Sequence, residues 1–195
     1  MQPHVLASAV ALALTGAGCT ARIQPPASPD RPTTAYVLDH GTTASLVLPA
    51  GEKAVRYAHG DWRYYARGHR GPSGAMHALL WPSAGTLGRK PLGDASSSEA
   101  VRAAVGVDID EIYPVDVSRD RAETLSADLA AAHRAGEPHT FNPQAGLHFA
   151  RVEHGYHFFN NSNQAVARWL ERLGCEITGP VVLSNWQLAD PTASE

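Results

Sequence analysis

The sequence predicts an α+β fold in which packed helices cover a small antiparallel sheet. Short runs rich in β-branched and apolar residues fill the start of the chain, and stretches with helical periodicity follow them. Further apolar runs come after the helices. Strands that precede and follow a block of helices, without alternating with them, favour this class. The chain of 195 residues, 44% of them apolar and 18% charged, is long enough for a single domain with a buried core.

Apolar runs bounded by turn residues predict the strands. The segment Asp39-His40-Gly41 separates the first two runs, and Pro49 ends the second. The expected strands cover residues 36–38, 44–48, 54–58, 111–117, 147–152 and 180–183. The folded domain is therefore expected to span residues 35–190.

Recurrence of apolar residues at steps of three and four predicts the helices. They are expected at residues 76–81, 100–105, 119–135 and 164–173. Ser96 and Glu99 have the spacing of a capping box before the second helix, and Gly136 ends the third. The residues expected to face the core are Leu125, Leu129 and Ala132 in the third helix, and Val166, Trp169, Leu170 and Leu173 in the fourth. Asn161 or Ser162 is the expected N-cap of the fourth helix.

The first residues carry the pattern of an exported lipoprotein. An apolar run over residues 5–14 has the length of a signal-peptide core and is too short to span a bilayer. Small residues lead from it to Cys19, an arrangement that resembles the lipobox of bacterial lipoproteins. We therefore expect a signal peptide at residues 1–18 and a lipid on Cys19. Ordinary secretion, with cleavage near Ala17 or Ala21, and an uncleaved anchor are the alternatives.

Residues 19–34 are expected to form an extended tether, because this segment is rich in Pro, Ser and Thr. The lipid on Cys19 would attach the protein to the lipid bilayer of the bacterial cell envelope. Thr20, which follows the cysteine, favours the periplasmic face of the outer membrane. Lipidation would leave Cys175 unpaired, as a small residue packed in the core.

Composition and spacing exclude several other functions. A net charge of −3 provides no basic surface for nucleic acid. The 10 histidines are scattered, with neither the HExxH motif nor a Cys–His spacing. We therefore expect no metal site and no other cofactor.

Three segments together resemble a family of uncharacterised bacterial envelope proteins. Residues 36–49 resemble the family's opening strand, its motif His-Gly-x-His-Thr and its second strand ending in Pro. Residues 57–65 resemble the block Gly-Trp-Gly-Asp-x-x-Phe-Tyr, and residues 159–174 resemble the helix that begins Asn-Cys-Asn-x-x-Val-Ala. The match spans about residues 36–175. That family is similar to the permuted papain-like superfamily, which includes cell-wall peptidases and lecithin:retinol acyltransferase relatives.

The resemblance implies a catalytic histidine early in the chain, on a strand, and a cysteine nucleophile late, at a helix N-terminus. There the helix dipole and an adjacent imidazole lower the pKa of the thiol. This chain departs from the pattern at both positions, since Thr43 replaces the second histidine and Ser162 replaces the cysteine. A serine hydroxyl needs a positioned base to attack. His40 is the first candidate, although strand alternation would place it on the opposite face from position 43, and His59 and His157 are others.

These motifs define the candidate site. The candidate catalytic residues are Ser162 and His40, and the candidate binding residues are Asp61, Trp62, Tyr65, Asn161 and Asn163. Each has a structural alternative: Ser162 as an N-cap, His40 as a hydrogen-bonded turn residue, Asp61 in a Gly-Asp turn, and the aromatic residues as part of the core or its rim.

Three functions remain open. The first is an envelope-anchored, catalytically degenerate papain-like domain that binds a peptide or glycan fragment, a lipid or another protein. The second is an active serine-type acyl hydrolase or acyltransferase that uses Ser162 with a nearby histidine, and the third is a structural lipoprotein without a ligand. A histidine nitrogen within hydrogen-bond reach of the Ser162 hydroxyl, oriented by a third group, would favour the enzyme. A Ser162 that only caps its helix would not.

Overall fold

A seven-stranded antiparallel sheet forms the centre of the fold. The computed structural model describes residues 20–66, 83–156, 160–182 and 184–189, and of residues 65–66, 83 and 154–156 it describes the backbone alone. The strands lie in the order β6 (Glu111–Ser118), β2 (Pro32–Asp39), β3 (Ala44–Ala50), β4 (Lys53–Asp61), β5 (Ser83–Gly93), β8 (Leu147–Tyr156) and β7 (His139–Asn142). Every neighbouring pair is antiparallel. The predicted α+β class with an antiparallel sheet is confirmed, and the sheet is larger than expected because β5 and β7 were not recognised.

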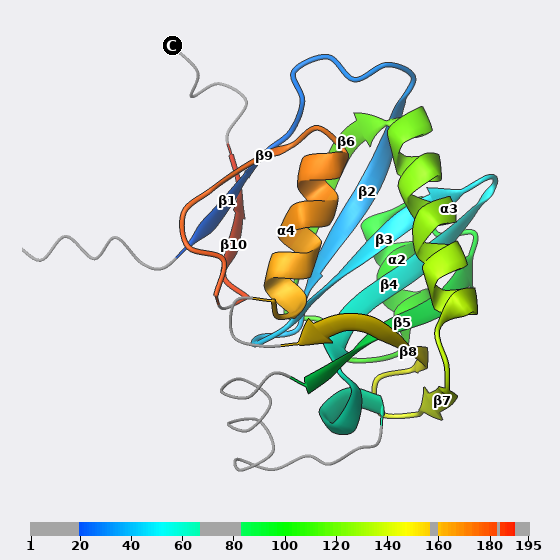
Figure 1. Cartoon of the computed structure of the whole chain (residues 1–195). Helices are drawn as coiled ribbons and strands as arrows, with labels where there is room; N and C mark the ends of the chain where they lie inside the picture. The colour runs from blue at the N-terminus through cyan, green and yellow to red at the C-terminus, as the bar shows by residue number, and fades with distance from the viewer. Residues whose placement is uncertain (1–19, 67–82, 157–159, 183, 190–195) are drawn as a thin grey trace, which may run out of the picture.

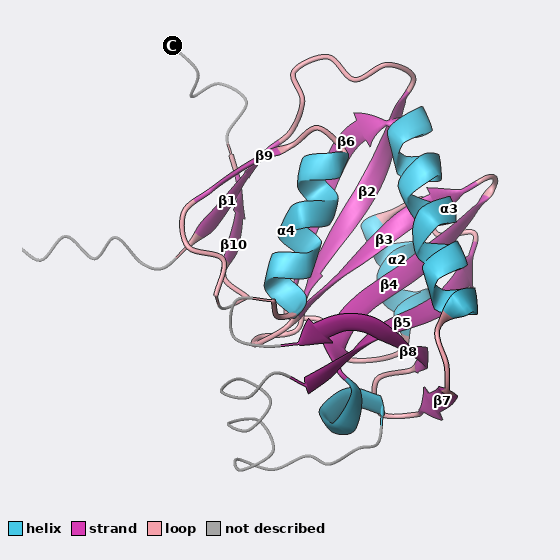
Figure 2. Cartoon of the chain, in the orientation of Figure 1, coloured by secondary structure: helices cyan, strands magenta, loops and turns pink. Residues whose placement is uncertain are grey.

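Helices cover both faces of this sheet (Figure 1). The helices α3 (Arg119–Ala135) and α4 (Ser162–Arg172) lie on the near face in Figure 2, and α2 (Ser98–Val105) lies behind the sheet. A short π-helix, η1 (Trp62–Ala66), follows β4 directly. Because both faces are covered, β2, β3 and β4 are buried along most of their length. This explains why their sequences are nearly continuous apolar runs, with little alternation.

Two core layers result from this arrangement. Between the sheet and the helices α3 and α4, the buried residues include Leu46, Tyr57, Leu125, Val166 and Leu170. Between the sheet and α2, they include Tyr36, Leu38, Val47, Val101 and Val105. The predicted apolar face of α4 is confirmed, since Val166, Trp169, Leu170 and Leu173 are all buried.

Several expected details were wrong. The N-cap of α2 is Ser97, whose hydroxyl accepts from the Ala100 N–H at 3.2 Å, one residue later than the predicted Ser96. Ala132, near the end of α3, is exposed, and the buried residues of that helix are Ala122, Leu125, Ser126 and Leu129. No strand covers residues 180–182, and the nearby strands are β9 (Glu176–Thr178) and β10 (Trp186–Leu188). The helix expected at residues 76–81 lies outside the described residues.

The expected tether at residues 19–34 was also wrong. Strand β1 (Ala21–Gln24) pairs parallel with β10 and antiparallel with β9, in a second, three-stranded sheet. Its alternate residues Ala21 and Ile23 are 0% exposed and belong to the same core cluster as α4. The Pro-rich composition concealed this strand, because two apolar residues are its only buried contacts. The described fold therefore begins by residue 21 rather than 35.

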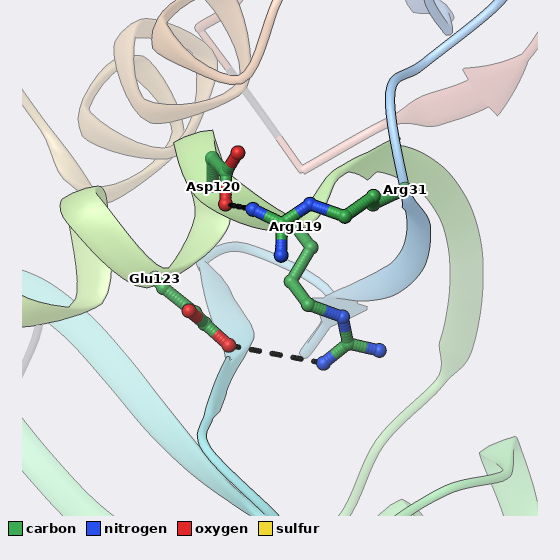
Figure 3. Close-up of polar contacts among 4 residues, drawn as sticks. All are labelled: Arg31, Arg119, Asp120 and Glu123. Atoms are coloured by element: carbon green, nitrogen blue, oxygen red, sulfur yellow. Dashed lines mark hydrogen bonds and ion pairs between the residues drawn. The ribbon is translucent and has the colours of Figure 1, made fainter.

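The segment between β1 and β2 is fixed at its end to the start of α3. The Arg31 guanidinium forms an ion pair with Asp120 (Figure 3). The Arg31 carbonyl accepts from the Arg119 N–H at 3.1 Å. Arg119 also pairs with Glu123 at 3.8 Å, one turn further along the helix. Residues 1–18 and Cys19 lie outside the described residues. None of the described helices is long and apolar enough to cross a membrane.

The burial of β1 leads to a stability prediction. Ile23→Ala is expected to lower the free energy of unfolding by about 2–5 kcal/mol, because it leaves a cavity in the core beside α4. Urea unfolding of the full-length chain measures this. Arg22→Ala is the matched control, since the Arg22 side chain on the same strand is exposed and its loss should change stability by less than about 0.5 kcal/mol. Equal stability of the Ile23 variant and the wild type would show that residues 21–24 are not part of the fold.

Candidate functional site

A cavity of about 230 Å³ lies where the N-terminus of α4 meets the turn between β2 and β3. Its polar lining includes His40, Ser45, Arg56, His59 and Ser162. Apolar side chains from β4, from β8 and from the loops before β6 and β8 complete the wall. Both candidate catalytic residues, Ser162 and His40, therefore lie at the same cavity.

The position of His40 differs from the one expected. His40 lies in the turn after β2, where its N–H donates to the Thr43 carbonyl at 2.9 Å. Strand alternation does not apply to a turn, so His40 and Thr43 both line the cavity rather than pointing to opposite faces. His157, another candidate base, lies outside the described residues.

Ser162 is the first residue of α4 and is not its cap. The cap is Asn161, whose side-chain oxygen accepts from the Gln164 N–H at 3.0 Å. Ser162 is 2% exposed, and its hydroxyl makes no hydrogen bond to any of the described residues. No described histidine therefore forms a hydrogen bond with that hydroxyl. The contact that a serine nucleophile at position 162 requires is absent from the described part of the chain.

Asn161 and Asn163 fix the start of α4 to two other segments. The side-chain amide of Asn161 donates to the Val182 carbonyl at 3.2 Å. The amide of Asn163 donates to the same carbonyl at 3.3 Å and to the Thr42 carbonyl at 3.2 Å. These two candidate binding residues are buried and do not line the cavity. They position the β2–β3 turn against the helix that carries Ser162.

Asp61 and Trp62 lie behind the cavity wall. Asp61 is buried at the end of β4, and its carboxylate accepts from the Tyr64 N–H at 2.6 Å, which stabilises the start of η1. The Trp62 side chain packs with Leu147 and Phe149 in a small apolar cluster. Trp62 thus supports the wall, and neither residue lines the cavity. The side chain of Tyr65 lies outside the described residues.

The central polar group of the cavity was not identified from the sequence. The Arg56 guanidinium donates through Nε to Ser45 Oγ at 2.9 Å, through Nη1 to the Ala145 carbonyl at 3.1 Å, and through Nη2 to His40 Nε2 at 3.0 Å. A detectable signal was present, because Ser45 and Arg56 are polar residues inside runs that are otherwise apolar. Polar residues in strands covered on both faces need partners, and these two are partners of each other.

His40 is held in its neutral form. Its Nδ1 lies 2.8 Å from the Asp108 carbonyl, which can only accept, so Nδ1 carries the proton. Its Nε2 accepts from Arg56 and lies 2.9 Å from Ser45 Oγ. Burial, followed by the positive charge of Arg56, lowers the pKa of His40, against the opposing effects of the Asp108 carbonyl and of the carboxylates of Asp39 and Asp110.

Arg56 remains charged without a carboxylate partner. Its side chain is 4% exposed, and burial lowers its pKa to about 10, so it is protonated at neutral pH. No ion pair joins Arg56 to any of the described carboxylates. Its cross-strand neighbour is another cation, Lys90, whose ammonium donates to the Val105 carbonyl at the end of α2 at 2.8 Å. The cavity therefore contains a buried positive charge that only neutral groups solvate within the described structure.

Ser45, His40 and the Asp108 carbonyl have the connectivity of a nucleophile, a base and a group that orients the base. One feature prevents this chemistry. Arg56 already donates to both Ser45 Oγ and His40 Nε2, which weakens the base. The three groups instead position the guanidinium.

No protein-family model, no curated protein and no solved structure matches this chain. Among the described residues, no group of three or more His, Cys, Asp or Glu side chains is arranged to hold a metal ion. The papain-like relationship thus stays a prediction.

The lowered pKa of His40 predicts how stability depends on pH. The imidazole of the unfolded chain has a pKa of about 6.5, which is higher than its pKa in the folded state. At pH values between these two pKa values, the unfolded chain therefore binds more protons than the folded chain. The unfolding free energy is therefore expected to fall as the pH drops below about 6.5, until the pKa of the folded state is passed. His40→Gln should reduce this slope, as measured by urea unfolding between pH 5 and pH 8. Some slope should remain in the variant, because burial also lowers the pKa of His133. Identical slopes in the variant and the wild type would contradict the prediction.

Proposed function

We propose that this chain is a ligand-binding domain that holds a small anion in the cavity, without catalysis by Ser162. The observation that carries the proposal is the buried guanidinium of Arg56, which has no carboxylate partner among the described residues. Removing an ionised group from water is costly unless the group is paired. A hydroxyl, a carbonyl and an imidazole satisfy donors of Arg56, but they do not balance its charge.

The remaining donors of Arg56 suit an anion. A guanidinium has five N–H groups, of which the three contacts use one on Nε and one on each terminal nitrogen. One N–H therefore remains on Nη1 and one on Nη2. Two such groups form the fork that binds a carboxylate in bidentate fashion.

The N-terminus of α4 supports the same conclusion. Ser162 is the first residue of that helix and lines the cavity, so the positive end of the helix dipole lies beside the site. The hydroxyl of Ser162, which makes no hydrogen bond to the described residues, is a further donor for an anion. A binding role explains this serine without requiring a base next to it.

The proposal extends to the origin and location of the domain. The resemblance assigns Thr43 and Ser162 to the places of the papain-like histidine and cysteine. Both residues line the cavity, which supports the proposal of a degenerate member of that superfamily. The signals at residues 1–19 support export and lipidation of Cys19, which would place the cavity in the bacterial cell envelope. An active serine hydrolase is the less supported alternative, because Ser162 lacks a base among the described residues.

Anion binding is tested by titrating the full-length chain with sodium acetate and with inorganic phosphate. We expect at least one of the two anions to shift the backbone amide signals of Ser162 and the Nε–H signal of Arg56 in NMR spectra. Arg56→Met should weaken that binding at least tenfold, about 1.4 kcal/mol, because it removes the charge and the fork. Arg56→Lys, which keeps the charge alone, should fall in between.

Arg89→Met is the matched control for this titration. Arg89 lies on the adjacent strand β5 and does not line the cavity, so its replacement should leave anion affinity unchanged. Failure of both anions to bind, or equal affinity in the wild type and in Arg56→Met, would refute the proposed function.

The papain-like relationship has a separate test. In a Cys175→Ala background, Ser162→Cys combined with Thr43→His should restore a reactive thiolate, because the helix N-terminus and the imidazole both lower the thiol pKa. Iodoacetamide labelling of the full-length variant, with peptide mapping at position 162, reports that thiolate. Ser162→Cys alone is the control and should react more slowly. Equal labelling rates would mean that positions 43 and 162 do not form a papain-like pair.

A further inference from the structure

We infer that the anion is a monocarboxylic acid with a flat apolar tail, about the size of benzoate. This inference rests on the proposed function and specifies its ligand class. It depends on three properties of the cavity: the amount of buried charge, the shape of the apolar wall and the volume.

The charge of the cavity matches one carboxylate. Arg56 is its buried cation, and His40 is kept neutral by its burial and by Arg56, whose Nη2 donates to His40 Nε2. Asp108, the other charged residue of the described lining, is exposed. Lys90 does not line the cavity, because its ammonium is directed to the end of α2. A phosphate group carries about −1.5 to −2 charges at neutral pH and would bring an excess of negative charge into a site with a single cation. A monocarboxylate leaves the buried pair neutral.

The apolar wall of the cavity combines an aromatic ring with a small residue. Ala58 of β4 pairs with Gly88 of β5, which in turn pairs with Phe149 of β8, so two small residues lie side by side in the sheet. The Phe149 ring packs directly on Gly88, since a Cβ at that glycine would lie 2.6 Å from Phe149 Cε1. Phe149 and Leu147 are both buried, whereas Ala58 is half-buried and faces the cavity.

The position of Arg56 sets the orientation of the ligand. Its Nη1 contacts the Ala145 carbonyl, and the apolar side chains of Ala58, Leu147 and Phe149 line the same cavity. A carboxylate at Arg56 therefore places its substituent against these apolar residues. Ligand sites of this kind combine an apolar wall with a few placed polar groups.

The volume sets the size of the tail. The cavity measures about 230 Å³. An apolar protein cavity of about 150 Å³ is known to accept benzene. The remaining space suffices for a carboxylate, whereas a peptide or a glycan chain would enter only in part. These properties together favour a benzoate-sized acid over the larger ligands that the sequence left open.

The test compares four probes on the full-length chain by calorimetric titration: benzoate, acetate, inorganic phosphate and benzyl alcohol. We expect benzoate to bind at least tenfold more tightly than acetate or phosphate, and benzyl alcohol, which lacks the charge, to bind at least tenfold more weakly than benzoate. Ala58→Val should weaken the binding of benzoate at least tenfold and change the affinity for acetate by no more than about twofold. The added methyl groups fill the space of the ring and not that of the carboxylate. Ala145→Val, in the loop before β8, is a second narrowing variant in case the strand substitution impairs folding.

The outcomes separate this inference from the proposed function. Binding of acetate or phosphate, with benzoate no tighter than acetate, would overturn the inference and leave anion binding in place. Absence of binding by all three anions would remove the proposed function as well. Benzyl alcohol binding as tightly as benzoate, with no effect of Arg56→Met, would show an apolar pocket and overturn both.

Discussion

The buried guanidinium of Arg56 is the constraint on which the cavity depends. It lies on a central strand, covered by helices on both faces of the sheet, where an ionised group loses its hydration. Its contacts to Ser45, His40 and the carbonyl of Ala145 bring together β3, the β2–β3 turn and the loop before β8. An apolar residue of similar size would be expected to stabilise a purely structural sheet as well or better, since buried ions contribute little net stability. The presence of Arg56 is therefore explained by the cavity rather than by the packing.

The position of α4 completes the site from the other side. Asn161 caps the helix, and Asn163 connects its first turn to the β2–β3 turn and to residue 182. Because the asparagines make these structural contacts, the hydroxyl of Ser162 between them is not needed for capping. The two asparagines thus make the structural contacts, and the Ser162 hydroxyl remains available to the cavity. This division of roles was not visible from the sequence, where Asn161 and Ser162 were equally suitable caps.

Local patterns could be read from the sequence, and long-range contacts could not. The bounds of α3 match the predicted ones at both ends because its periodicity is long and a glycine follows it. The strands of the β2–β3–β4 region were predicted because each is an apolar run between turn residues. Strand β1 was missed because its partners β9 and β10 lie near the other end of the chain, and its own composition is that of a linker. Likewise Ser162 and His40 were selected from motifs, whereas the hydrogen-bond partner of Arg56, the Ala145 carbonyl, lies 89 positions further along the chain. No local pattern reports such a contact.

The incorporation of β1 into the second sheet has a consequence for how the domain would sit at a membrane. If Cys19 carries a lipid, only Thr20 separates the modified residue from the strand that starts at Ala21. Two residues of extended chain reach about 7 Å, so the folded body would touch the headgroups instead of moving freely above them. The small sheet of β1, β9 and β10 would then be the surface nearest the bilayer. Such an anchor would restrict the rotation of the whole domain and give the cavity a fixed direction relative to the lipid surface.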